Sequence, residues 1–166
     1  MNIRMGSADE PVEIRPVRED DLDLICYHRA EMFRESGRRD ADIRDMAEPF
    51  RAWLAPRLAD GRYFGFIAVR SGSAIGGVGL TELAWPPHPL HPTEDRRGYV
   101  MNVYVEKNDR GRGVARALMR AAESEFARRG VSFLVLHYSE AGKPLYEGMK
   151  WERTREMAKS MRSPGP

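Results

Sequence analysis

The stretch 99–120, YVMNVYVEKNDRGRGVARALMR, constrains the fold most, because its hydrophobic period changes partway along it. Residues 99–105 alternate with a period of two and are rich in β-branched and aromatic residues, which indicates a strand. The alternation predicts one face with Tyr99, Met101, Val103 and Val105, and the opposite face with Val100, Asn102 and Tyr104. Farther on, helical spacing relates Ala115, Leu118, Met119, Ala122 and Phe126. A polar turn with two glycines separates the patterns, so the stretch predicts a strand, a short glycine-rich turn and a helix.

This order of elements is typical of an anion site. The first turn of a helix has free N–H groups and the positive end of the helix dipole. Gly111 and Gly113 let the backbone approach a ligand closely, which suits phosphate or pyrophosphate. The alternative is that the glycines only form a turn, and that Arg112, Arg116 and Arg120 are a solvated stripe at every fourth position.

Two common phosphate loops do not fit this turn. The chain has no G-x-x-x-x-G-K-[ST] and no G-x-G-x-x-G. The residues do match [RQ]-x-x-G-x-[GA] after a hydrophobic strand, at 110–115, and so resemble the acetyl-CoA motif of the GNAT superfamily of N-acetyltransferases. The resemblance implies that the pantetheine arm pairs with the backbone near Val103 and Val105, and that the pyrophosphate lies on the amides of 110–115. The cofactor-binding residues that it implies are Val103, Tyr104, Val105, Arg110, Gly111, Arg112, Gly113, Val114, Ala115, Arg116 and Ser139.

A second block, residues 139–151, resembles the GNAT pattern N-x-x-A-x-x-L-Y-x-x-x-G-[FY]. Leu145, Tyr146 and Trp151 match it. Three positions depart from it, with Ser139 for asparagine, Gly142 for alanine and Lys150 for glycine. The serine hydroxyl still offers a hydrogen bond to a pantetheine amide or to a water molecule.

The resemblance assigns the chemistry to few groups. Tyr146 is the predicted acid for the departing thiolate, because a phenol with a pKa near 10 is protonated at neutral pH. Its alternative role is packing beside Leu145. A backbone amide near Val103 or Tyr104 is the predicted oxyanion donor. Glu82, at the end of a strand expected to face the cleft, is the candidate base, with a water relay or an amine that arrives neutral as alternatives.

The pattern of elements predicts an α/β (α+β) fold with a mixed, mostly antiparallel central sheet of 6–7 strands and helices on both faces. Strands are expected at 12–17, 63–69, 74–80, 99–106, 131–138 and 151–157, with the apolar strand 131–138 central. Helices are expected at 20–36, capped by Asp20, at 41–60, after the glycine turn and from 139. Pro49 and Pro56 predict a kink or two pieces in the second helix. The GNAT resemblance implies that strands 99–106 and 131–138 splay apart. We expect a single domain over 1–166, with 1–10 and 159–166 loose.

Composition narrows the remaining options. The net charge of +2, from 27 basic and 25 acidic residues, gives no electrostatic case for nucleic acid. The single cysteine, Cys26, excludes an internal disulfide and is expected to be a buried core thiol. His88 and His91 lack a third ligand nearby, so no metal is predicted. No apolar run approaches membrane-span length and no signal peptide is seen, which predicts no membrane partner and a cytoplasmic location.

The predicted function is acetyl-CoA-dependent N-acetyltransfer to a small-molecule or peptide amine, by a monomer or homodimer. Alternatives are a non-catalytic acyl-CoA-binding or regulatory domain and a nucleic-acid module that uses the arginine stripe. Helix 20–36 and loop 86–98 are expected to shape the acceptor pocket, with Met32, Phe33 and Trp53 either facing substrate or packed in the core. Acidic side chains give a weak lean toward a cationic amine, namely Glu31, Glu35, Glu82, Glu94 and Asp95.

Overall fold

The computed structural model describes residues 10–161, and their core is a five-stranded sheet in the order β1-β2-β3-β4-β5. The strands are β1 (Glu13–Pro16), β2 (Phe64–Arg70), β3 (Ser73–Ala84), β4 (Arg96–Val105) and β5 (Leu134–Leu136). The helices are α1 (Leu22–Glu35), α2 (Asp40–Ala59), α3 (Val114–Arg128) and α4 (Lys143–Gly148), with short 3-10 turns η1 (Glu19–Asp21) and η2 (Lys107–Asp109). The ends expected to be loose lie mostly outside the described residues.

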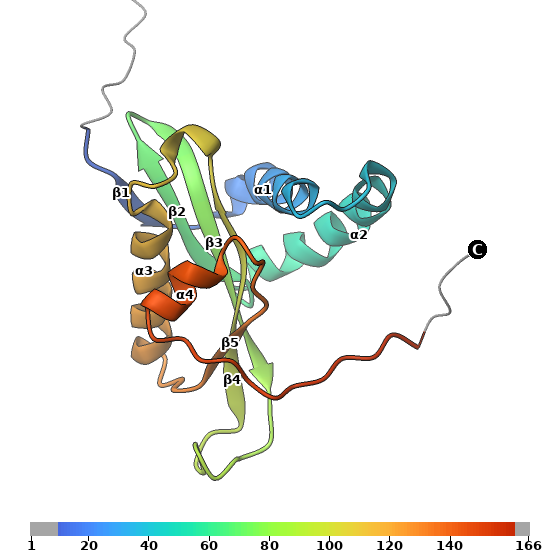
Figure 1. Cartoon of the computed structure of the whole chain (residues 1–166), viewed down its shortest axis with the longest axis vertical. Coiled ribbons are helices and arrows are strands. Elements are labelled where there is room, and N and C mark those ends of the chain that lie inside the picture. The colour runs from blue at the N-terminus through green and yellow to red at the C-terminus, as the bar shows by residue number, and fades with distance from the viewer. Residues whose placement is uncertain (1–9, 162–166) are drawn as a thin grey trace, which may run out of the picture.

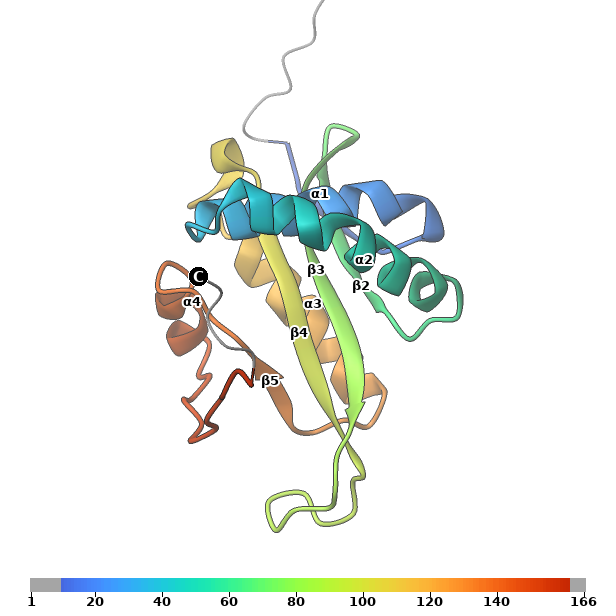
Figure 2. The same ribbon diagram turned by 90° about the vertical axis from the view of Figure 1, so that its right-hand side faces the viewer.

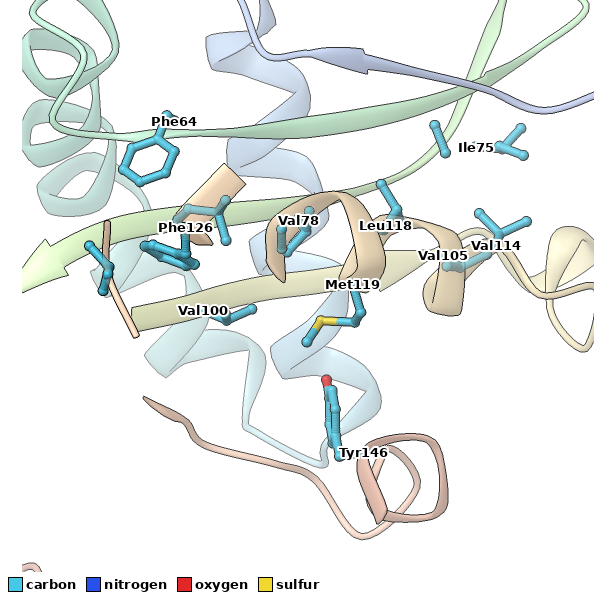
Figure 3. Packing of buried hydrophobic residues seen from close by; sticks show 14 residues of the cluster. Phe64, Ile75, Val78, Val100, Val105, Val114, Leu118, Met119, Phe126 and Tyr146 are labelled. Carbon is cyan, nitrogen blue, oxygen red and sulfur yellow. The ribbon is translucent and has the colours of Figure 1, made fainter. Parts of the chain in front are cut away.

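Helices cover both faces of the sheet. Helices α1 and α2 lie on one face and α3 on the other, with α4 beside β5 (Figures 1 and 2). One hydrophobic cluster fills the space between the sheet and α3, where Phe126, Leu118 and Met119 are fully buried (Figure 3). A second cluster, around Leu54 and Tyr63, joins α1 and α2 to the sheet. The predicted mixed α/β fold is therefore confirmed.

The sheet has five strands rather than six or seven. Residues 152–161 form no strand. Trp151 instead packs its ring beside Tyr146, and its Nε1 donates to Glu123 at 2.8 Å. Strand β5 is short and at the edge, so its expected central place is wrong. Its apolar residues Leu134 and Leu136 instead cover the margin of the α3 cluster.

Strands β4 and β5 splay apart, as expected. All other neighbouring strands pair antiparallel, whereas β5 pairs parallel with β4 only from Gly98 to Val100. Beyond Val100 no strand of the described chain pairs with the β5-facing edge of β4. The second half of β4 is therefore free to pair with something other than β5.

A β-bulge makes the predicted faces of β4 wrong beyond Met101. The pairing of β4 with β3 slips between Gly77 and Gly79, and Asn102 adopts a left-handed backbone with φ of 54°. The extra residue turns both Met101 and Asn102 toward the α1–α2 side. Val103 and Val105 consequently join the α3 cluster, while Tyr104 contacts α1.

Local expectations have mixed outcomes. Of the kink or two pieces predicted for the second helix, the two pieces are wrong, because α2 is one helix from Asp40 to Ala59 that contains Pro49 and Pro56. Asp20 does not cap α1; instead the carboxylate of Asp21 accepts a hydrogen bond from the Arg18 amide at 2.8 Å. Cys26 is only partly buried, at the edge of the second cluster.

Residues 10–161 lack two features that would suggest other kinds of protein. None of their helices combines the length and apolar character that crossing a membrane requires. Within the same range no three His, Cys, Asp or Glu side chains gather as metal ligands would.

Candidate active site

A cleft of about 1310 Å³ opens where β4 and β5 part. Its walls are α1, the second half of β4, the start of α3 and the segment from β5 into α4. Residues of both sequence blocks line it, including Val103, Gly113, Ser139 and Tyr146. The splayed sheet therefore brings together two motifs that are about thirty residues apart in sequence.

The glycine turn presents unpaired backbone donors to this cleft. Gly111 and Gly113 have φ of 71° and 80°, a left-handed backbone that glycine adopts without strain. No acceptor in the described chain binds the N–H groups of 111–116. A Cβ built on either glycine would meet no atom within 4 Å, so the turn is open to a ligand. These features fit a bound pyrophosphate at the N-terminus of α3.

Arg110 fixes the turn rather than pointing its side chain at an anion. Its Nε donates to the Val105 carbonyl at 2.8 Å, and its Nη2 binds both carboxylate oxygens of Glu35 at 2.8 and 3.0 Å. These contacts tie the turn to the end of β4 and to α1. The other two arginines of the motif differ, because Arg116 lines the cleft whereas Arg112 is exposed and does not.

Residues 103–105 of β4 line the cleft. The Tyr104 ring packs against His28 of α1, with 5.0 Å between centroids. Burial lowers the pKa of His28 to about 4, which keeps it neutral. The predicted pantetheine partners Val103, Tyr104 and Val105 thus meet the cleft along one strand edge.

Tyr146 and Ser139 flank the cleft from the α4 side. Tyr146 is 9% exposed, and burial raises the pKa of its phenol. Figure 3 shows its hydroxyl pointing from α4 toward Met119 of α3. The Ser139 hydroxyl accepts a hydrogen bond from the Gly142 amide at 3.2 Å, at the turn before α4. A buried neutral phenol at this position has the protonation state that an acid needs.

The candidate base Glu82 does not line the cleft. Its carboxylate contacts Arg96 at 2.7 Å and Arg129 at 3.6 Å, near the far end of α3. The loop expected to shape the acceptor pocket is also elsewhere, because β3 and β4 stay paired to Ala84 and Arg96 and carry the loop to the opposite end of the hairpin (Figure 2). At about 3.3 Å per residue, that pairing spans roughly the length of the sheet.

The remaining predictions about the acceptor pocket have mixed outcomes. Met32 and Phe33 line the cleft, whereas Trp53 packs in the second cluster against Phe50 and Tyr63. Of the acidic residues behind the lean toward a cationic amine, Glu35 alone lines the cleft, and Arg110 and Lys107 pair with it. The other four residues behind the lean therefore lie outside the cleft.

The structure adds residues that the sequence analysis did not single out. Arg29 and Asn102 meet through a 2.7 Å bond from Nη1 to Oδ1, and the Asn102 Nδ2 donates to the Tyr63 hydroxyl at 3.1 Å. The Tyr99 hydroxyl lies 2.7 Å from Nδ1 of His137, across the gap between β4 and β5. One signal was present in the sequence, because Arg29 is the charged member of an otherwise apolar helical face.

The model of the family described as "Acetyltransferase (GNAT) family" matches residues 25–149. A GCN5-related N-acetyltransferase from Ralstonia eutropha has 51% identity and a TM-score of 0.89, over 91% of this chain and 99% of that one. A predicted acetyltransferase from Clostridium acetobutylicum, solved with acetyl-CoA, has 22% identity and a TM-score of 0.81, over 90% and 96% of the chains. A search of curated proteins gave no match.

Proposed function

The chain belongs to the GNAT family of acetyltransferases, and from this premise we propose that it moves the acetyl group of acetyl-CoA directly to a primary amine in a ternary complex. The observation that carries the proposal is the open turn of residues 111–116, whose free N–H groups share one cleft with the unpaired edge of β4 and with Tyr146. Acetyl-CoA supplies the activated thioester, and each feature of the cleft has a role in its transfer.

The proposed roles follow from the chemistry of acyl transfer. The amides of 111–116 hold the pyrophosphate, the β4 edge at Val103–Val105 orients the pantetheine arm, and the Ser139 hydroxyl offers it one more hydrogen bond. A backbone amide near Val103 or Tyr104 stabilises the developing oxyanion. Tyr146 gives its proton to the departing thiolate.

The proton of the attacking amine needs a group that accepts it. Glu82 is outside the cleft, so we do not assign it. His137 is the histidine that lines the cleft among residues 10–161, and its hydrogen bond to Tyr99 orients its ring. An amine that arrives neutral needs no base beyond water or this imidazole.

A pair of glycine variants tests the binding part of the proposal. Gly113→Val should weaken acetyl-CoA binding at least several-fold, because the side chain occupies the open face of the turn. Gly130→Val is a matched control at the other end of α3, since Gly130 has φ of 73° and similarly open surroundings. Titration calorimetry of both variants measures affinity, and thermal unfolding measures the backbone strain that they share. Unchanged affinity in a folded Gly113→Val protein would refute the assignment.

Release of CoA thiol with a panel of primary amines tests the catalytic part. An N-acetyltransferase gives amine-dependent release, whereas a non-catalytic acyl-CoA-binding protein binds acetyl-CoA and releases none. Mass spectrometry of the products identifies the acetylated nitrogen.

A further inference from the structure

We propose that Arg29 binds a carboxylate of the acceptor, so that the substrate is an amino acid or another amine with a carboxylate close to its amino group. This inference rests on the proposed acetyltransfer and names its substrate class. It depends on the position of Arg29 at the cleft, on its lack of a carboxylate partner, and on the two aromatic rings that hold its guanidinium.

Arg29 lies at the acceptor end of the cleft. It projects from α1 and meets β4 at Asn102, just before the segment Val103–Val105 along which the pantetheine arm is proposed to lie. The glycine turn that would hold the pyrophosphate is at the other end of that segment. A group bound at Arg29 is therefore beyond the thioester and on the side from which an amine would attack.

The guanidinium of Arg29 is held in place but poorly satisfied. It lies between the rings of Phe33 and Phe50, at 4.9 and 4.4 Å from their centroids. Of the five N–H donors of an arginine, only Nη1 has a partner, the neutral amide oxygen of Asn102. The Nε is buried without any partner. Burial also lowers the pKa of Arg29, which reflects the same shortage of compensating charge.

Comparison with two other arginines shows that the lack of a counter-ion is specific to Arg29. Arg70 and Arg97 also have a buried, unpartnered Nε, but each forms an ion pair, with Asp109 and Glu156. In the part of the chain that the structure describes, no carboxylate pairs with Arg29. Arg29 thus combines a missing counter-ion with a place on the wall of the cleft.

A purely structural role explains this arrangement less well. Desolvating a charge costs several kcal/mol in real proteins, and an apolar side chain would fill the slot between two aromatic rings without that cost. A planar guanidinium pre-oriented by stacking and by Asn102 is instead suited to a bidentate carboxylate. Bound substrate would then supply the negative charge that the protein omits.

Matched pairs of substrates test the inference on the intact protein. Each L-amino acid in a panel is compared with its own amide, which keeps the side chain and the amine but lacks the carboxylate. Because a charge-assisted hydrogen bond is involved, kcat/KM for the acids should exceed that for the amides by about 10- to 100-fold. Arg29→Gln should bring this ratio close to one, with acetyl-CoA affinity unchanged.

Two further variants separate charge recognition from folding. Arg29→Lys keeps a positive charge without the planar fork, and should retain part of the acid preference. Arg57→Gln is the matched control, because Arg57 stacks on Trp53 in the neighbouring helix but is not part of the cleft. It should leave the ratio of acids to amides as in the wild type. Circular dichroism and thermal unfolding identify variants that do not fold.

A binding measurement keeps the inference separate from the catalytic proposal. With CoA present, calorimetry compares N-acetyl amino acids with their amides in wild-type protein and in Arg29→Gln. If the N-acetyl amino acids bind and Arg29→Gln abolishes that binding, the carboxylate site is supported even when no amine is acetylated. That result would refute only the proposed acetyltransfer. Equal kcat/KM and equal binding for acids and amides in the wild type would overturn the inference and leave acetyltransfer standing.

Discussion

Replacement of Asn102 by alanine is expected to be among the most damaging single changes at this site. Its side chain connects β4 to two groups from other elements, the half-buried Arg29 of α1 and the buried Tyr63 of the segment before β2. Asn102 is 4% exposed, so water cannot replace the lost amide without rearrangement. The same residue also supplies the left-handed backbone of the β4 bulge.

The magnitude follows from three contributions. The neutral bond to the Tyr63 hydroxyl contributes about 1 kcal/mol, and the bond from the charged Arg29 about 1.5–3 kcal/mol. Alanine in the left-handed region costs about 1 kcal/mol more. Their sum predicts a loss of about 3.5–5 kcal/mol in the free energy of unfolding, a large share of the roughly 5–15 kcal/mol typical of a domain.

Urea unfolding of three variants measures these contributions. Asn102→Gly loses the same two bonds but fits the backbone, so it should be no less stable than Asn102→Ala. Asn102→Asp replaces the Nδ2 donor with an oxygen that can accept a hydrogen bond from the Tyr63 hydroxyl, and it gives Arg29 a carboxylate. It should therefore recover most of the stability while weakening acetylation of carboxylate-bearing amines. A loss below about 1 kcal/mol in Asn102→Ala would refute this account of the bulge.

Two further predictions concern titratable side chains. Tyr146→Phe should lower turnover roughly 10- to 1000-fold with acetyl-CoA affinity nearly unchanged, whereas Tyr27→Phe, exposed and outside the cleft, should behave as wild type in the same steady-state assay. Full activity of Tyr146→Phe at every pH would leave this tyrosine as packing. Burial depresses the folded-state pKa of His28 to about 4, so between pH 6.5 and 4 the unfolded chain binds this proton more readily than the folded one. Stability should therefore fall as the pH is lowered through that window, by at most about 3.4 kcal/mol. Urea unfolding of His28→Gln should show a shallower pH dependence than wild type, and an identical one would contradict the burial argument.

The local units of this fold could be predicted from the sequence alone. The change of period around residue 106 specifies a strand, a turn and a helix, and glycine at 111 and 113 permits the left-handed backbone found there. The hairpin at Ser71 and Gly72 is equally local, and both residues have positive φ. Such features depend on neighbouring residues, so a window of about twenty residues contains the information they need.

Features that depend on partners distant in sequence could not be predicted in this way. The alternation of β4 reads as regular, and only pairing with the glycines of β3 places the bulge at Asn102 and reverses the faces of the residues after it. The prediction that Glu82 faces the cleft was wrong for a similar reason. Strand length and register decide which end of the β3–β4 hairpin meets the cleft.

Arg29 shows the division most clearly. The sequence by itself determined that an arginine interrupts the apolar face of α1. Only the tertiary structure decided that this charge is stacked between two rings, bound to the β4 bulge and left without a carboxylate at the wall of the cleft. The physical reason is that burial and charge pairing are properties of groups that the fold brings together, and no local pattern contains them.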